Sequence, residues 1–338
     1  MMNIRRIILS AFLTLATITG AWAVKAWPGI HTQQQSDGSL LNYRVLGDEH
    51  CHAFATIDGY LLVPNDKGYM CYARPTGRGG LMPSNLMAHD LKLRSDNERK
   101  ELESWGVNNF GRIYSEQTSK GMRNIKRLPG EAFPTQGNLK GIILLVEFAD
   151  NSMQEGHDSE LFHNLMNEPD CTRENATGSA RDYFIDQSSG LFTPEFDVVG
   201  PIKLSHRMSY YGANNSQGKD SKPGLMVKEA CEYAADSLGV DFSNYDFDND
   251  GTVDFVYVIY AGYAESYGAS SNTIWPHASQ LSLLGIGCSV SGKTVNRYAC
   301  SSELKYATGT RMEGIGTFCH EFSHVLGLPD MYNPSTTS

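Results

Sequence analysis

Basic residues and long apolar runs are both scarce in this sequence. Lys and Arg number 28 against 38 Asp and Glu, which gives a formal net charge of -10 over 338 residues. A protein that binds nucleic acid needs a basic surface, so this balance argues against a nucleic-acid partner and is compatible with cation binding. After residue 23 no apolar run approaches the length of a membrane span, so we expect no integral membrane segment in the mature chain.

The N-terminal end carries an apolar run of its own, but it is short. Residues 1–23 begin with two arginines, continue with an apolar stretch over residues 7–18 and end in Ala21-Trp22-Ala23. This is the pattern of a Sec-type signal peptide, so we expect a secreted, extracellular protein.

Cysteine is sparse as well, with seven residues in the whole chain. An exported chain can form disulfides, but an odd number leaves at least one thiol unpaired. Cys288 and Cys300 are close enough in sequence to close a local loop, and we hypothesise that pairing.

An apolar content of 41% is ample for a packed core, and the length allows more than one domain. Short alternating segments over residues 27–73 are separated by Asp37-Gly38, Asp58-Gly59 and Lys67-Gly68, which predicts antiparallel hairpins. Ser95 and Glu98 form a capping box for a polar helix.

The stretch 120–137 is expected to be an exposed linker. Its first part, residues 120–130, is basic, lacks hydrophobic periodicity and contains Pro and Gly. We hypothesise proteolytic processing within residues 123–127, and the alternative is an ordinary interdomain loop.

From residue 138 the pattern becomes that of an α/β layer. The near-continuous apolar run over residues 142–148 predicts a strand covered on both faces, and residues 255–262 predict a second one. Helices are expected at residues 161–166, 180–186 and 223–238, the last entered through Pro and closed by Gly.

Near the C-terminal end lies the motif His-Glu-x-x-His, at His320, Glu321 and His324. Residues four apart lie on one face of a helix, so both imidazoles can bind one Zn²⁺, while Glu321 can reach the open side of the metal as a general base. Gly327 can end the helix at positive φ, and Asp330 can return as a third ligand.

Each of these assignments has a plainer alternative. A helix can contain this motif by chance, with its histidines hydrogen-bonded in a structural role. The following Gly and Asp, together with an apolar stripe that would bury the opposite face, favour the metal site. Asp330 could instead hydrogen-bond the turn, with the third ligand lying elsewhere.

A second cation site is predicted in the acidic stretch 246–254. Asp246, Asp248, Asp250 and Asp254 occupy positions one, three, five and nine, and Thr252 at position seven offers a main-chain carbonyl, as in a Ca²⁺-binding loop. Position twelve is a tyrosine rather than the bidentate glutamate of an EF-hand. The site is expected to be structural, and the alternative is a solvated acidic turn.

The run from His320 to Tyr332 closely resembles the active-site motif of the immune inhibitor A family of secreted bacterial metallopeptidases, relatives of the metzincins. Residues 178–184, 210–212 and 274–277 also resemble this family. The resemblance implies a zinc-dependent endopeptidase acting on proteins or peptides, with zinc as catalytic cofactor and a pro-segment over residues 24–119. By analogy, the edge of the strand at residues 255–262 would bind substrate.

The expected fold is therefore α+β, with a β-rich pro-segment followed over residues 138–338 by the N-terminal part of a metzincin-like α/β zinc-peptidase domain. The C-terminal subdomain of such enzymes, with its methionine turn, is not in this sequence. A zymogen needs a group that occupies the open position of the metal until the protein is exported. Cys51, its neighbouring histidines and the nearby acidic residues are all candidates for this group, and the sequence does not choose between them. The alternative function is a catalytically silent, calcium-stabilised binding module, and the oligomeric state is not predicted.

Overall fold

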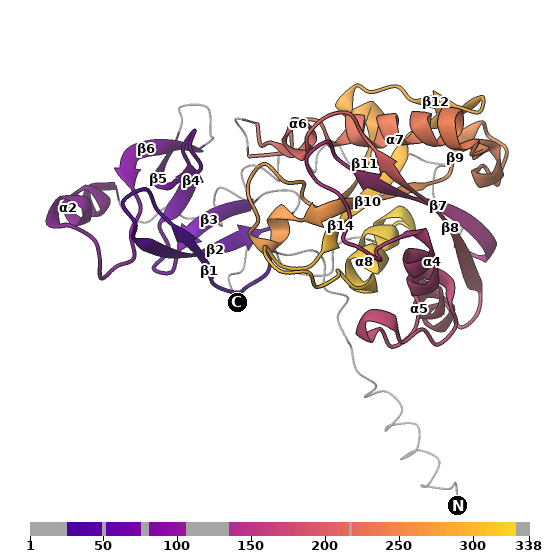
Figure 1. Ribbon diagram of the computed structural model, residues 1–338, viewed down its shortest axis with the longest axis horizontal. Coiled ribbons are helices and arrows are strands. Elements are labelled where there is room, and N and C mark those ends of the chain that lie inside the picture. Colours follow the sequence, from indigo (N-terminus) through magenta and orange to yellow (C-terminus); the bar gives the residue numbers. More distant parts are fainter. Residues whose placement is uncertain (1–25, 49–51, 76–80, 106–134, 216–217, 329–338) are drawn as a thin grey trace, which may run out of the picture.

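The structure, a computed structural model, describes residues 26–48, 52–75, 81–105, 135–215 and 218–328. Within these ranges the chain forms an N-terminal sheet and a larger α/β part (Figure 1). The predicted signal peptide, Asp330, Cys51 and the predicted processing site lie outside the described residues. No helix in the described ranges is long and apolar enough to cross a membrane.

The N-terminal sheet is a six-stranded antiparallel meander in which each strand pairs with the next in sequence, as the turn pattern predicts. The turns contain Gly38, Gly59 and Gly68 at positive φ, a conformation that costs glycine little. The helix that follows begins at the predicted capping box, where Glu98 N–H donates to Ser95 Oγ. The elements are β1 (His31–Gln34), β2 (Leu40–Gly47), β3 (His52–Thr56), β4 (Leu61–Pro64), β5 (Met70–Pro75), β6 (Leu81–Met87) and α2 (Asp96–Trp105).

The larger part is built on a five-stranded sheet of order β11-β14-β10-β7-β8. Its strands are parallel except β11, which runs antiparallel to β14 and forms one edge. The bounds are β7 (Gly137–Glu147), β8 (Phe192–Lys203), β10 (Val256–Tyr263), β11 (His277–Gln280) and β14 (Arg297–Leu304).

Helices cover both faces of this sheet, as Figure 1 shows. Ile142 and Leu144 of β7 join one core with the apolar side of α7 (Pro223–Leu238). Ile143 and Leu145 join the opposite core, to which α4, α5 and α8 contribute. Because successive strand residues point to opposite faces, the continuous apolar run of β7 is explained by burial on both sides. The other helices of this layer are α4 (Ser159–Asn167), α5 (Ala180–Gln187) and α8 (Ile315–Val325).

Shorter elements complete the larger part. A small sheet pairs β12 with β13 and β13 with β9. These elements are β9 (Thr252–Val253), β12 (Ser289–Val290), β13 (Lys293–Val295), α6 (Met208–Gly212) and the 3-10 helices η2 (Arg173–Asn175), η3 (Phe242–Tyr245), η4 (Glu265–Tyr267) and η5 (Leu281–Leu284).

The mixed α/β structure confirms the α+β prediction in its coarse form. Two finer predictions are wrong. β10 lies between β14 and β7, so both of its edges are already paired and it cannot add a substrate strand. Cys288 and Cys300 are both free, because Cys300 lies beside His277 while Cys288 contacts the thiol of Cys231 in α7.

Candidate metal centre

α8 carries the His-Glu-x-x-His motif, and aromatic packing fixes its position. The helix begins after Gly314 and places Phe318 and Phe322 in the core beneath the sheet. The Phe322 ring lies 5.0 Å from that of Phe255 and 5.2 Å from that of Phe184, as distances between ring centroids. Since residues 318 and 320 project about 200° apart on a helix, this buried face directs the histidines to the other side.

The two histidines converge as predicted. His320 Nε2 and His324 Nε2 are 3.0 Å apart, and the rings are nearly perpendicular, at 81°. Two Zn–N bonds of about 2.0–2.1 Å at a tetrahedral angle place their nitrogens roughly 3.3 Å apart. The pair therefore fits a shared zinc ion with only a small adjustment.

The second nitrogen of His324 orients this ring. His324 Nδ1 is 2.8 Å from the carbonyl oxygen of Leu328, which can only accept a hydrogen bond, so Nδ1 is assigned as the donor. Nε2 then keeps its lone pair for a metal. A hydrogen bond of this kind on the outer nitrogen is usual for metal-binding histidines.

Glu321 lies beside the two histidines and is fully buried. Its Oε1 is 4.0 Å from His320 Nε2, and His320, Glu321 and His324 each bring a ligand atom into one group spanning 4.8 Å. A carboxylate at this distance can contact a water molecule that shares the metal with the imidazoles.

The helix ends as the sequence predicts. Gly327 adopts φ +91°, its N–H donates to the carbonyl of His324, and Leu328 N–H donates to the carbonyl of Ser323. This is a Schellman cap, which turns the chain sharply after the last histidine. Asp330 lies beyond the described residues, so its role as third ligand stays a prediction.

A buried carboxyl group precedes α8 and was not singled out from the sequence. Glu313 Oε1 accepts hydrogen bonds from Tyr267 Oη at 3.2 Å and Thr317 Oγ1 at 3.0 Å. Burial raises the pKa of Glu313, and Lys305 opposes that shift. Glu313 therefore anchors the first turn of α8 to the segment that contains Tyr267.

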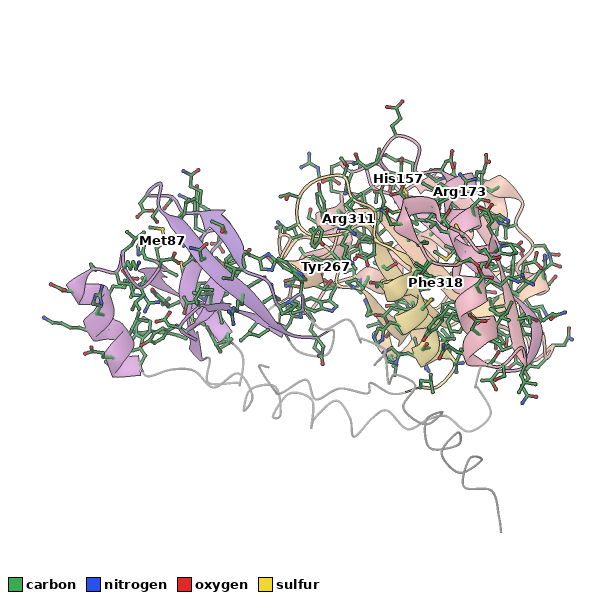
Figure 2. All side chains as sticks on the ribbon, turned by 90° about the horizontal axis from the view of Figure 1, so that it is seen from below. Met87, His157, Arg173, Tyr267, Arg311 and Phe318 are labelled. Atoms are coloured by element: carbon green, nitrogen blue, oxygen red, sulfur yellow. The ribbon has the colours of Figure 1, made fainter. Side chains whose placement is uncertain are left out.

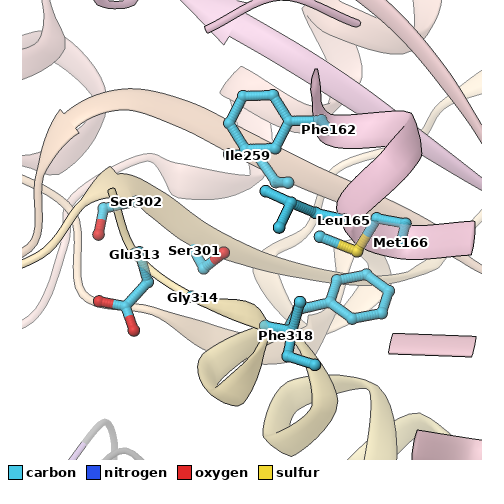
Figure 3. Close-up of a pocket in the computed structure, with 10 residues that line it drawn as sticks. Phe162, Leu165, Met166, Ile259, Ser301, Ser302, Glu313, Gly314 and Phe318 are labelled. Atoms are coloured by element: carbon cyan, nitrogen blue, oxygen red, sulfur yellow. The ribbon is translucent and has the colours of Figure 1, made fainter. Parts of the chain in front are cut away.

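A small pocket lies at this end of α8, with Glu313 and two serines at one side and apolar side chains at the other (Figure 3). Phe318, on the buried face of the helix, forms part of its wall. The metal ligands lie on the opposite face of α8, so this pocket is separate from the candidate metal centre. It is lined by Phe162, Leu165, Met166, Ile259, Ser301, Ser302, Glu313, Gly314, Ile315 and Phe318.

The acidic loop brings three of its predicted ligands together. Asp246, Asp248 and Asp250 each offer an oxygen within one 4.8 Å group. Asp246 Oδ2 also lies 2.6 Å from Lys293 Nζ, an ion pair that the sequence did not predict because Lys293 is 47 residues away. The Lys293 side chain is 22% exposed, so its ammonium group can move into solvent when a cation binds.

The other two predicted calcium ligands lie close by. Thr252 begins β9, and Asp254 Oδ2 accepts a hydrogen bond from Phe247 N–H at 2.7 Å. Burial raises the pKa of Asp254 to about 6, and repulsion from the three neighbouring carboxylates adds to this shift. A divalent cation would relieve that repulsion.

Two other residues lie in structural positions. His277 lies 2.7 Å from the Trp275 carbonyl oxygen through Nδ1 and 2.9 Å from Tyr298 Oη through Nε2. Cys319 is buried, as expected for a small core residue, and burial raises its pKa.

Comparison with known proteins adds independent information. The profile of a family described as Immune inhibitor A peptidase M6, catalytic domain, matches residues 138–338. Immune inhibitor A of Bacillus thuringiensis subsp. alesti is 26% identical over 233 residues, which cover 59% of this chain and 34% of that protein. Pre-pro-metalloprotease PrtV of Vibrio cholerae serotype O1 (strain M66-2) is 23% identical over 235 residues, which cover 59% of this chain and 25% of that protein. The matched region thus covers about a third or less of each relative.

Proposed function

Because the chain belongs to the Immune inhibitor A peptidase M6 family, we propose that it is a secreted zinc-dependent endopeptidase that is made as a zymogen. The observation that carries this proposal is the convergence of His320 Nε2 and His324 Nε2, 3.0 Å apart, beside a buried Glu321. Two imidazoles and one carboxylate, the third ligand proposed to be Asp330, suit a catalytic zinc ion with an open position.

The residues of α8 have different roles in the proposed reaction. His320 and His324 would hold the zinc ion, which when bound lowers the pKa of its water and polarises the scissile carbonyl group. Glu321 accepts the proton of the attacking water and passes it to the leaving amine. The hydrogen bond from His324 to the Leu328 carbonyl holds the ring in place during this cycle.

The free edge of β11 is the proposed binding site for an extended substrate. Leu281 N–H donates to the Asn296 carbonyl, and the same register pairs Ser279 with Tyr298. In an antiparallel ladder, hydrogen-bonded residue pairs alternate with pairs that are not hydrogen-bonded. Ser279 therefore bonds to β14, and the N–H and C=O groups of Ala278 and Gln280 point away from it. No described strand pairs with that edge, and Ala278 packs against the core that contains α8. A peptide added there would lie beside the active-site helix.

The N-terminal sheet occupies most of the proposed pro-segment, residues 24–119. Residues 120–137 would then be the linker that is cut on activation, and residues 1–23 the signal peptide that directs export.

Removing the metal tests this proposal. We expect protein purified from the full-length gene to hydrolyse casein, to lose at least about 10³-fold in rate after treatment with a chelator, and to recover when zinc is restored, because the metal supplies several kcal/mol to the reaction. Treatment with the chelator already saturated with zinc is the control. Hydrolysis that survives complete removal of the metal would reject a zinc peptidase, and a zinc-loaded protein without hydrolysis would favour the binding module.

The acidic loop is proposed to bind calcium in a structural role through Asp246, Asp248, Asp250, Asp254 and the carbonyl of Thr252. Three converging carboxylates and the raised pKa of Asp254 support this. Extracellular calcium is abundant enough for such a site to need only modest affinity.

Calcium should therefore raise the melting temperature. At a concentration about 100 times Kd the expected increase is about 5–10 °C, since a ligand bound only by the native state stabilises it by about 2.7 kcal/mol. Asp248→Ala should remove this increase, whereas Asp236→Ala, which changes an exposed acidic residue of α7, should not. Equal melting curves with and without calcium would reject the calcium site and favour the alternative, a solvated acidic turn.

A further inference from the structure

Two cysteine thiols meet between α7 and the small sheet that β9, β13 and β12 form. Cys231 lies on the buried side of α7, and Cys288 directly precedes β12. Both belong to the core between α7 and the five-stranded sheet, where they are 0% and 5% exposed. The thiol of Cys231 donates a hydrogen bond to the sulfur of Cys288. The fold thus brings two thiols from distant parts of the sequence into direct contact.

Hydrogen bonds of the neighbouring chain hold Cys288 in this position. Its carbonyl oxygen accepts from Val295 N–H of β13 at 3.0 Å. In the turn after β12, Ser291 Oγ accepts from Phe242 N–H at 3.2 Å and donates to the Val240 carbonyl at 3.3 Å. These bonds join β12 to the segment that follows α7. Both thiols are therefore placed by ordered structure, and no further loop has to close before the sulfur atoms meet.

Other cysteines of the described residues lie in different surroundings. Cys300, the partner expected for Cys288 from the sequence, has its Sγ 3.5 Å from His277 Nδ1. Cys71 lies in the N-terminal sheet, and Cys319 lies in the core on the opposite face of the five-stranded sheet from α7. The neighbour of Cys288 is set by the approach of α7, which sequence spacing does not show.

The two thiols in contact differ in their acidity. The hydrogen bond from Cys231 lowers the pKa of Cys288, although burial and the charge of Glu232 act in the opposite direction. The same hydrogen bond, together with burial, raises the pKa of Cys231 well above its usual value. The thiolate is the form of cysteine that attacks a disulfide. Cys288, which is also the more exposed of the two, is thus suited to react first, and Cys231 to react second.

We propose that Cys231 and Cys288 form a disulfide that cross-links α7 to the small sheet, by exchange with a low-molecular-weight disulfide. The Cys288 thiolate attacks that disulfide, which forms a mixed disulfide and releases one thiolate. Cys231 then loses its proton and attacks the Cys288 sulfur of the mixed disulfide, which releases the second thiolate. The two protein thiols are oxidised, and the external disulfide is reduced to two thiols. The oxidising conditions outside the cell would let this bond persist.

The cross-link would restrain the acidic loop as well. The small sheet pairs β13 with β9, which begins at Thr252, and Thr294 N–H donates to the Gly251 carbonyl at 2.9 Å. Lys293 of β13 forms the ion pair with Asp246. A bond that fastens β12 to α7 therefore also limits the motion of the segment that carries the proposed calcium ligands.

The pair is remote from the N-terminal sheet. Both cysteines lie within residues 138–338, the part that the family profile matches. Figure 1 shows β12 and β9 in the half of the larger part that is farther from the N-terminal sheet, whereas Figure 2 shows Tyr267 on the side that faces this sheet. Removal of the N-terminal sheet should therefore leave the disulfide in place. The inference does not depend on peptidase activity, and its test on purified protein does not depend on export.

Alkylation of the full chain after incubation of the folded protein with glutathione disulfide tests the proposal. Trypsin cleaves after Lys228 and Lys293, so residues 229–293 form one peptide, whose only cysteines are Cys231 and Cys288. When the oxidised protein is unfolded with excess alkylating agent, this peptide should carry no alkyl group and lack two hydrogen atoms. After reduction it should carry two alkyl groups. Two alkyl groups after oxidation, or glutathione retained on Cys288, would overturn the proposal.

Thermal unfolding gives a second readout. Because a cross-link restricts the unfolded chain, the oxidised protein should melt about 5–10 °C above the reduced protein. Cys231→Ser should remove this difference and leave Cys288 open to alkylation. Cys300→Ser is the matched control, and it should keep both the unalkylated peptide and the difference in melting temperature. An undiminished difference in Cys231→Ser would assign the effect to other cysteines and contradict the proposed pair.

Discussion

Replacing Glu321 by Gln should lower the rate of peptide hydrolysis by about 10²–10⁴-fold, the usual contribution of a general base. Gln keeps the size of the side chain but cannot accept the proton of the attacking water. Glu321 is fully buried, with its Oε1 4.0 Å from His320 Nε2. Gln has nearly the same shape, so it can fill the same buried space. Zinc content should stay at the wild-type level, because both histidines remain in place.

The measurement is the rate of casein hydrolysis by full-length protein, with zinc content determined on the same samples. Glu232→Gln, which alters a partly exposed glutamate of α7 that pairs with Lys228, is the control and should keep the wild-type rate. Equal rates for wild type and Glu321→Gln would remove Glu321 from the mechanism. A loss of zinc together with activity would instead assign Glu321 to metal binding.

Replacing His324 by Ala should abolish both zinc binding and hydrolysis. Its Nε2 lies 3.0 Å from that of His320, and its ring is held by the Leu328 carbonyl, so this change removes one of the two converging imidazoles. A ligand that binds only the native state stabilises it. Zinc should therefore raise the melting temperature of the wild type and leave that of His324→Ala unchanged.

Thermal unfolding with and without zinc measures this effect. His163→Ala is the matched control, because His163 is an exposed histidine of α4 whose hydrogen bonds, within the described part of the chain, are to Asn167 of the same helix. It should respond to zinc as the wild type does. An undiminished zinc response in His324→Ala would place the metal elsewhere in the protein.

The sequence predicts best where local periodicity and burial agree. The four-residue spacing of His320 and His324 and the glycine that ends the helix are properties of a single turn, so they could be derived without a partner segment. The helix at residues 223–238 was also predicted at its observed bounds, because proline begins it and glycine ends it.

Properties that depend on distant segments could not be derived. β8 contains Pro194 and Pro201, which argue against a strand, yet β8 forms a sheet edge where proline is tolerated. Strand order cannot be read from the sequence either, so β10 was expected to have a free edge, although the edge strands of this sheet are β8 and β11. The ion pair of Lys293 with Asp246 and the stacking of His52 on Trp275 join residues far apart in sequence.

The ratio of zinc to protein, measured on purified wild type beside His320→Ala, tests the central claim most directly. One ion per wild-type chain, and close to none in the variant, is the predicted result, since one imidazole of the α8 pair and the proposed Asp330 carboxylate leave only two protein ligands for the metal. An equal zinc ratio in the two proteins would contradict the assignment of the metal centre to α8.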